Sequence, residues 1–146
     1  MLTQTYAHEV EPHFVGMEED IKILVSKMKD EKRQRIVKIC EMGGLGKTTL
    51  ARKVYNHTNL QSYSRAWVCI TQQFQPKAVF SDMLKQLDSN VKIDNFEVRN
   101  LVTRIYNFLA KRKCLIVIDD DIWEDDHWES IGQAFPVNCN VIFTTC

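Results

Sequence analysis

The sequence predicts an α/β protein in which helices cover both faces of a parallel sheet. First, short apolar segments alternate along the chain with segments of helical periodicity, which indicates βα units. Second, residues 115–118 are apolar at every position, as is typical of a strand that is buried on both faces. Third, a glycine-rich loop at residues 43–46 lies between a predicted strand and a predicted helix. Together these observations predict a three-layer α/β/α core.

The predicted elements follow in the order that such a core requires. An amphipathic helix at residues 18–29 comes first, because its apolar residues recur at helical spacing. Further helices are expected at residues 47–55, 76–87 and 96–109, and strands at residues 35–40, 64–70, 115–118 and 141–145. Residues 1–14 show no periodicity, so we interpret them as a linker remnant in front of one domain at residues 15–146.

The composition is that of an ordinary globular chain, and it argues against several classes of protein. A length of 146 residues suffices for one domain with a core, and a net charge of zero argues against a nucleic-acid-binding protein. No apolar segment is long enough to span a bilayer, and the first residues lack the apolar part of a signal peptide. Five cysteines without a C-x-x-C pair fit a reducing compartment, so we expect a cytoplasmic location.

The segment CEMGGLGKTT, residues 40–49, ends like the phosphate-binding loop G-x-x-x-x-G-K-[ST]. Glycines let successive backbone N–H groups wrap a phosphate, and the helix that follows adds a positive dipole end. A lysine supplies a point charge for the β- and γ-phosphates, and a hydroxyl after it can bind Mg²⁺. The positions that carry this chemistry are Gly43, Gly44, Gly46, Lys47 and Thr48.

The loop departs from the strict pattern, and a second motif has to support it. Glu41 stands where the pattern has its first glycine, so a glycine-rich turn without a ligand is the alternative interpretation. However, Asp119 directly follows the apolar segment at residues 115–118, which is where a phosphate-binding-loop domain needs an acid for Mg²⁺. The alternative role of Asp119 is that of a helix or turn cap. Because both motifs occur in order, we favour a nucleotide site.

With these residues, the chain resembles the NB-ARC nucleotide-binding domain of plant nucleotide-binding leucine-rich-repeat (NLR) disease-resistance proteins. The resemblance covers the chain from about residue 14 onwards, and is carried by residues 15–18, 42–51, 64–74, 114–123 and 141–145. Trp123 and the segment RAWV are similar to the branch with an N-terminal coiled coil. The resemblance implies a parallel-sheet P-loop NTPase fold of the STAND/AAA-like kind, incomplete at its C-terminus.

The resemblance also implies a function and a set of site residues. In the family, ADP holds the off state, ATP the signalling state, and slow hydrolysis resets the switch. The residues that match the family's phosphate-binding positions are Gly43, Gly44, Gly46, Lys47, Thr48 and Thr49. Thr48 and Asp119 match the Mg²⁺ positions, and Asp120 matches the second acid, which would polarise the attacking water. Val15 would lie near the adenine, with simple core packing as its alternative.

Two departures from the family concern the chemistry of the site. If the Glu41 carboxylate lies about 7 Å from a phosphate at an effective dielectric constant of about 20, repulsion costs about 2 kcal/mol, or roughly 30-fold in affinity. Three acids, Asp119 to Asp121, occupy a motif that normally has two. Counted from the apolar strand, the pair is Asp119 and Asp120. Counted back from Trp123, it is Asp120 and Asp121, and we prefer the first register.

Two further departures concern the end of the sequence. Cys146 falls where the family has an arginine that senses the γ-phosphate. The family's sheet has the order 5-1-4-3-2, and the present sequence ends after the fourth strand. The strand at residues 35–40 would then be an open edge, which favours pairing with other chains.

Three functions are therefore compared. The first is an ADP/ATP-binding switch module of a plant immune receptor, impaired by truncation. The second is a remnant that binds no nucleotide and associates with full-length NLR proteins or with itself. The third is a free-standing P-loop NTPase, at most a weak ATPase. We rank them in this order and expect nucleotide as a partner, with no nucleic acid and no membrane span.

Overall fold

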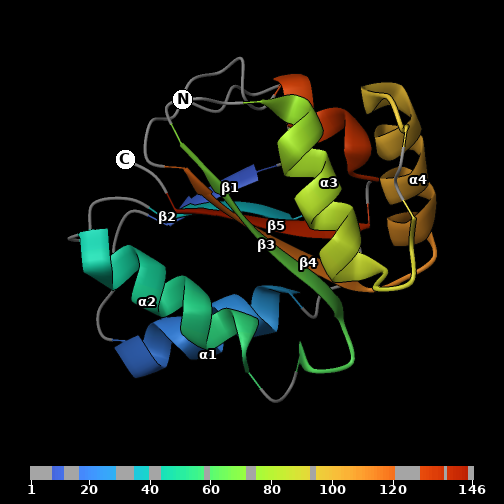
Figure 1. Ribbon diagram of the computed structural model, residues 1–146. Helices are drawn as coiled ribbons and strands as arrows, with labels where there is room; N and C mark the ends of the chain where they lie inside the picture. Colours follow the sequence, from blue (N-terminus) through green and yellow to red (C-terminus); the bar gives the residue numbers. More distant parts are fainter. Residues whose placement is uncertain are drawn as a thin grey trace.

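The computed structural model describes residues 8–11, 17–28, 35–39, 44–57, 60–71, 75–92, 95–120, 129–136 and 138–144. A five-stranded parallel sheet with the order β1-β2-β5-β4-β3 forms the middle layer (Figure 1). The strands are β1 (His8–Glu11), β2 (Arg35–Ile39), β3 (Ser64–Ile70), β4 (Cys114–Asp120) and β5 (Cys139–Thr144). The helices are α1 (Met17–Met28), α2 (Gly44–Tyr55), α3 (Pro76–Leu87), α4 (Val98–Ala110) and the 3₁₀ helix η2 (Gly132–Ala134). The predicted α/β class is confirmed.

Helices lie on both faces of the sheet (Figure 1). On one face, α1 and α2 pack over the sheet, and their buried side chains form a core with Leu115 and Val117 of β4 and Ile142 of β5. On the other face, α3 and α4 pack over a larger core that includes Ile116 and Val141. Successive side chains of a strand point to opposite faces, which is why residues 115–118 of β4 and 141–143 of β5 are apolar at every position.

The helices begin where their sequence provides a suitable start. Helix α3 begins at Pro76, whose missing N–H costs nothing in the first turn. Helix α4 begins at Val98, two residues later than the periodicity predicts, because Glu97 caps it. The Glu97 backbone N–H donates to Asn100 Oδ1 at 2.9 Å, and the Glu97 side chain accepts from the backbone at Asn100.

The predicted open edge at β2 is wrong, because β1 covers it. The register pairs His8 with Ile36 and continues in parallel to Glu11, which pairs with Ile39. The backbone N–H and C=O groups of an apolar edge strand need partners, and a nearby extended segment can supply them. The segment HEVE carries no apolar pattern that would have predicted a strand. The division into a linker and a domain stays a prediction, although this strand lies within the predicted linker.

The other outer strand, β3, contacts a helix on each face of the sheet. The side-chain amide of Gln86 accepts from the Trp67 backbone N–H at 2.7 Å and donates to the Trp67 C=O at 2.8 Å. On the α2 side, the rings of Trp67 and Tyr55 meet edge to face with centroids 5.5 Å apart, and the Arg52 guanidinium lies 5.6 Å from the Trp67 ring centroid. These contacts fix β3 against α2 and α3.

Two cysteines face each other at the start of β4 and β5, and they predict a stability that depends on pH. Cys114 and Cys139 are paired in the register, and neither is exposed to solvent. Burial raises the pKa of the Cys139 thiol well above its usual value, and the neighbouring Cys114 thiol raises it further. Above about pH 8.5 the unfolded chain releases this proton while the folded chain keeps it. The free energy of unfolding should therefore fall as the pH rises, by up to about 1.4 kcal/mol per pH unit.

This prediction is checked by urea unfolding at several pH values between about 7.5 and 9.5. Burial also raises the pKa of Tyr55, but a tyrosine titrates only from about pH 10 upwards, so it contributes little in this range. Cys139→Ala is the control, because it removes the thiol whose pKa is raised. In this variant the free energy of unfolding should fall less steeply with pH. The same decline in Cys139→Ala and in the unaltered chain would contradict the prediction.

Candidate functional site

The ends of three neighbouring strands line up at one edge of the sheet. Ile39, the last residue of β2, is paired with Thr144, the last residue of β5, and Thr144 is paired with Asp119 of β4. Carboxyl ends of parallel strands share one edge, where open α/β sheets bind ligands. The glycine-rich loop starts directly after Ile39 and leads into α2, which begins at Gly44. The start of α2 and the polar strand ends therefore belong to the same edge.

Side-chain alternation places Asp119 and Thr144 on the face of the sheet that carries α2. Asp119 follows Leu115 and Val117 at steps of two, and those residues belong to the core under α1 and α2. Thr144 follows Ile142 of the same core by two positions. Asp119 is half-buried, as expected for a side chain at the end of a strand, where the core meets solvent. The register in which Asp119 is the first acid of the pair stays a prediction.

Asp120 differs from Asp119 in both direction and burial. It continues the series of Ile116 and Ile118, which pack on the α3 and α4 side, and it is only 1% exposed. The structure thus separates the two predicted acids, with Asp119 on the α2 face and Asp120 on the opposite face. Asp121, the third acid of the run, lies outside the described residues.

A side-chain hydrogen bond joins two of the aligned strand ends. The Thr144 hydroxyl donates to Asp119 Oδ1 at 2.8 Å, and Thr144 is only 4% exposed. In the sequence, Thr144 belongs to a segment that carries the family resemblance, but no role is predicted for it. The sequence does show that each of the two strands ends in polar residues, and the register of β4 and β5 pairs one from each strand. Sequence patterns do not supply the register itself.

The start of α2 supplies backbone groups for an anion. The first N–H groups of a helix have no partner within the helix, and the dipole favours negative charge there. The first turn of α2 contains no acid, and its last turn carries Arg52 and Lys53. The loop residues within α2 are Gly44, Gly46, Lys47, Thr48 and Thr49, of which Thr49 is half-buried. The side chains of Lys47 and Thr48 lie outside the described part, as do Val15, Glu41, Gly43, Trp123 and Cys146.

The set of donors fits a metal that is bound mainly through phosphate. Among the described residues, no group of three or more histidine, cysteine or acidic side chains could hold a metal ion. Mg²⁺ usually keeps several waters and is bound through one or two carboxylates together with phosphate oxygens. A single half-buried carboxylate beside a predicted phosphate loop, as at Asp119, suits this mode.

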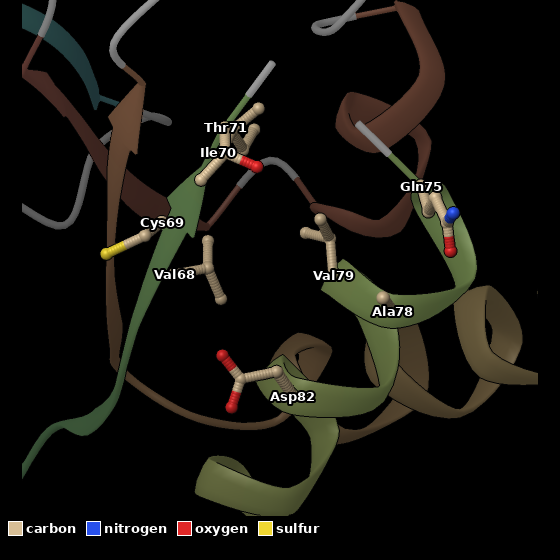
Figure 2. A pocket seen from close by; sticks show the side chains of 8 residues that line it. All are labelled: Val68, Cys69, Ile70, Thr71, Gln75, Ala78, Val79 and Asp82. Carbon is tan, nitrogen blue, oxygen red and sulfur yellow. The ribbon is translucent and has the colours of Figure 1, made fainter. Parts of the chain in front are cut away.

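A cavity of about 250 Å³ lies elsewhere, between the end of β3 and the first turns of α3 (Figure 2). Its walls include Val68 and Ile70 of β3 and Val79 of α3, which belong to the core on the α3 side, and the Asp82 side chain reaches toward the strand. Neither Asp119 nor Thr144 lines it. This cavity therefore lies at the carboxyl end of β3 on the α3 side of the sheet, whereas Asp119 and Thr144 lie on the α2 side.

A parallel sheet, a glycine-rich segment that leads from β2 into α2, and an acid at the end of β4 on the α2 face of the sheet define a P-loop nucleotide-binding protein. Comparison with protein families gives the particular family, because the NB-ARC domain matches residues 17–146. This chain belongs to the NB-ARC domain family.

Relatives among curated plant proteins agree with this family. The chain is 42% identical over 142 residues to "Probable disease resistance protein At1g58390" of Arabidopsis thaliana, covering 94% of the chain and 16% of that relative. It is 39% identical over 140 residues to "Probable disease resistance protein At1g59620" of the same organism, covering 93% of the chain and 16% of the relative. The chain thus spans about a sixth of the length of these relatives. In its described part, no helix is long and apolar enough to cross a membrane.

Proposed function

We propose that this chain is an ADP/ATP-binding switch module of a plant immune receptor. The observation that carries the proposal is the alignment of Ile39, Thr144 and Asp119 at one edge of the sheet, on the face where α2 starts. A phosphate group above the start of α2 would lie beside the acid that a bound Mg²⁺ needs. The names of the relatives, which are disease resistance proteins, support the immune role.

Each residue contributes a distinct interaction to this proposal. Backbone N–H groups at the glycines surround the phosphates, and Lys47 adds a positive charge at the β- and γ-phosphates. Thr48 and Asp119 provide oxygen atoms for the magnesium ion and its water shell. Bound Mg²⁺ would supply charge neutralisation at the phosphates.

We propose that this chain hydrolyses ATP only slowly. Asp120 is the acid that would polarise the attacking water, but it lies on the face opposite Asp119 and is 1% exposed. A carboxylate in that position has little access to water beside a phosphate. Nucleotide binding with weak ATPase activity therefore suits the geometry better than the turnover of a free-standing NTPase. We also propose a cytoplasmic location and membership of the coiled-coil branch.

One observation favours a second function. Glu41 puts a negative charge into the loop that has to receive phosphate. If that charge prevents binding, the chain acts as a remnant that associates with full-length NLR proteins or with a second copy of itself.

Calorimetric titration with ADP and Mg²⁺ distinguishes the two functions. Lys47→Ala should weaken binding at least about 10-fold, because it removes a charged hydrogen-bond donor from the phosphates. Lys53→Ala is a matched control, since it removes the same charge from the exposed last turn of the same helix and should leave the affinity unchanged. Equal affinities of the two variants would contradict the proposed site, and a folded wild-type chain that binds no ADP would favour the remnant.

A further inference from the structure

We infer that Thr144 is a positioning residue for the metal that accompanies the nucleotide. Its hydroxyl donates to one carboxylate oxygen of Asp119, Oδ1. The other oxygen, Oδ2, would then bind the magnesium ion or its water shell. The inference rests on the proposed function, and it adds a residue on a third strand end to a site that so far consists of the loop and the acid.

The backbone brings the two side chains together before any ligand binds. Asp119 and Thr144 are register partners on adjacent parallel strands, and alternation places both on the α2 face. Both strands are central in the five-stranded sheet, so neither end is free to shift without breaking pairing on two sides. The distance of 2.8 Å between Thr144 Oγ1 and Asp119 Oδ1 is therefore a property of the sheet rather than of a loop.

The chemistry of threonine makes the contact directional. A β-branched side chain has few χ1 rotamers, so the backbone of β5 fixes where the hydroxyl points. Thr144 is only 4% exposed, and a buried hydroxyl needs a hydrogen-bond partner. Asp119 Oδ1 is the acceptor that the structure gives it. The carboxylate thereby loses rotational freedom, and the cost of ordering it is met by folding rather than by metal binding.

Such a contact has a measurable effect on metal affinity. Hydrogen bonds that orient a ligating carboxylate typically change metal affinity 10–100-fold when they are removed. A purely structural role predicts something different. If the hydrogen bond only satisfies a buried hydroxyl, its loss changes stability but leaves the dependence of ADP binding on Mg²⁺ as it was.

The test compares Thr144→Val, which keeps the shape but removes the hydroxyl, with Thr144→Ser, which keeps the hydroxyl. For each full-length variant, the Kd for ADP is measured with excess Mg²⁺ and with EDTA. The Kd in EDTA divided by the Kd in Mg²⁺ gives the contribution of the metal to affinity. We expect Thr144→Val to reduce this ratio about 10-fold or more and Thr144→Ser to retain it. ADP binding in EDTA shows that each variant still has a folded loop.

The outcomes separate this inference from the proposed function. If wild-type protein binds ADP with a Mg²⁺ effect that Thr144→Val retains, or that Thr144→Ser loses equally, the positioning role is wrong and the nucleotide site stands. If the wild-type chain is folded but binds no ADP in either condition, the proposed function fails, and the role of Thr144 fails with it.

Discussion

Glu41→Gly is expected to tighten ADP binding about 30-fold. At a distance of about 7 Å and an effective dielectric constant of about 20, one carboxylate repels one unit of phosphate charge by about 2 kcal/mol. Glu41 is the residue at the position where phosphate-binding loops have their first glycine, so the substitution also restores the backbone freedom that the motif uses. Calorimetry with ADP and Mg²⁺ at constant ionic strength measures the change directly.

Glu41→Gln separates the two causes. It removes the charge but keeps a side chain, so it should reproduce most of the gain if Coulomb repulsion dominates. The gain should also shrink at high salt, because exposed charges are screened over about 10 Å at 0.1 M ionic strength. A tightening in Glu41→Gly without any in Glu41→Gln would assign the effect to the backbone. No tightening in either variant would show that Glu41 does not oppose binding.

The largest effect on stability is expected for Phe80→Ala. Phe80 is a large, fully buried side chain on α3, and it packs in the core between α3, α4 and the sheet. Removing a buried phenyl ring forfeits its transfer free energy and leaves a cavity, which typically costs about 3–5 kcal/mol. Because small domains are stable by only about 5–15 kcal/mol, the urea midpoint should fall by a large fraction.

Tyr106→Ala provides the matched control for an aromatic side chain. Tyr106 lies on α4 with 43% of its surface exposed, so its removal should change the free energy of unfolding by only about 0.5 kcal/mol. The loss of free energy of unfolding in Phe80→Leu should fall between the losses in Phe80→Ala and Tyr106→Ala. Phe80→Leu can still be measured if Phe80→Ala does not fold. Equal costs for Phe80→Ala and Tyr106→Ala would contradict the packing of α3 against the sheet.

The architecture could be predicted from the sequence, because the apolar strands and the periodic helices all indicate the same α/β fold. The apolar strands predicted a sheet covered on both faces, and the helix periodicity predicted α1, α3 and α4 within a few residues. The predicted strand at residues 115–118 was too short. Apolar character ends at Ile118, but ladder pairing uses backbone groups and continues through Asp120, which pairs with Ile70.

The edge strand was missed for a physical reason. Strand β1 has the sequence HEVE, in which Val10 is the one apolar residue, so no apolar periodicity could report it. Its formation depends on the backbone groups of β2, and each residue pairs with one 28 positions further along the chain, as His8 does with Ile36. Long-range pairing of this kind is not encoded in the pattern of either segment alone.

The candidate site could be predicted in part. The order of the loop and the acid gave the residue types, and the apolar strand before Asp119 gave the preferred register. The contact between Thr144 and Asp119 could not be predicted, because it depends on which strands are neighbours and in what register. The burial of Asp120 likewise follows from the packing of the opposite face, which a run of identical acids does not reveal.

The most direct test of the nucleotide site is a map of backbone amide chemical shifts on addition of ADP and Mg²⁺. The largest changes should occur at the first residues of α2, at Asp119 and at Thr144, which lie at one edge of the sheet. In Lys47→Ala these changes should require at least about 10-fold more ADP. Shifts confined to the cavity between β3 and α3, around Val68 and Val79, would contradict the account, as would the absence of any shift in the folded chain.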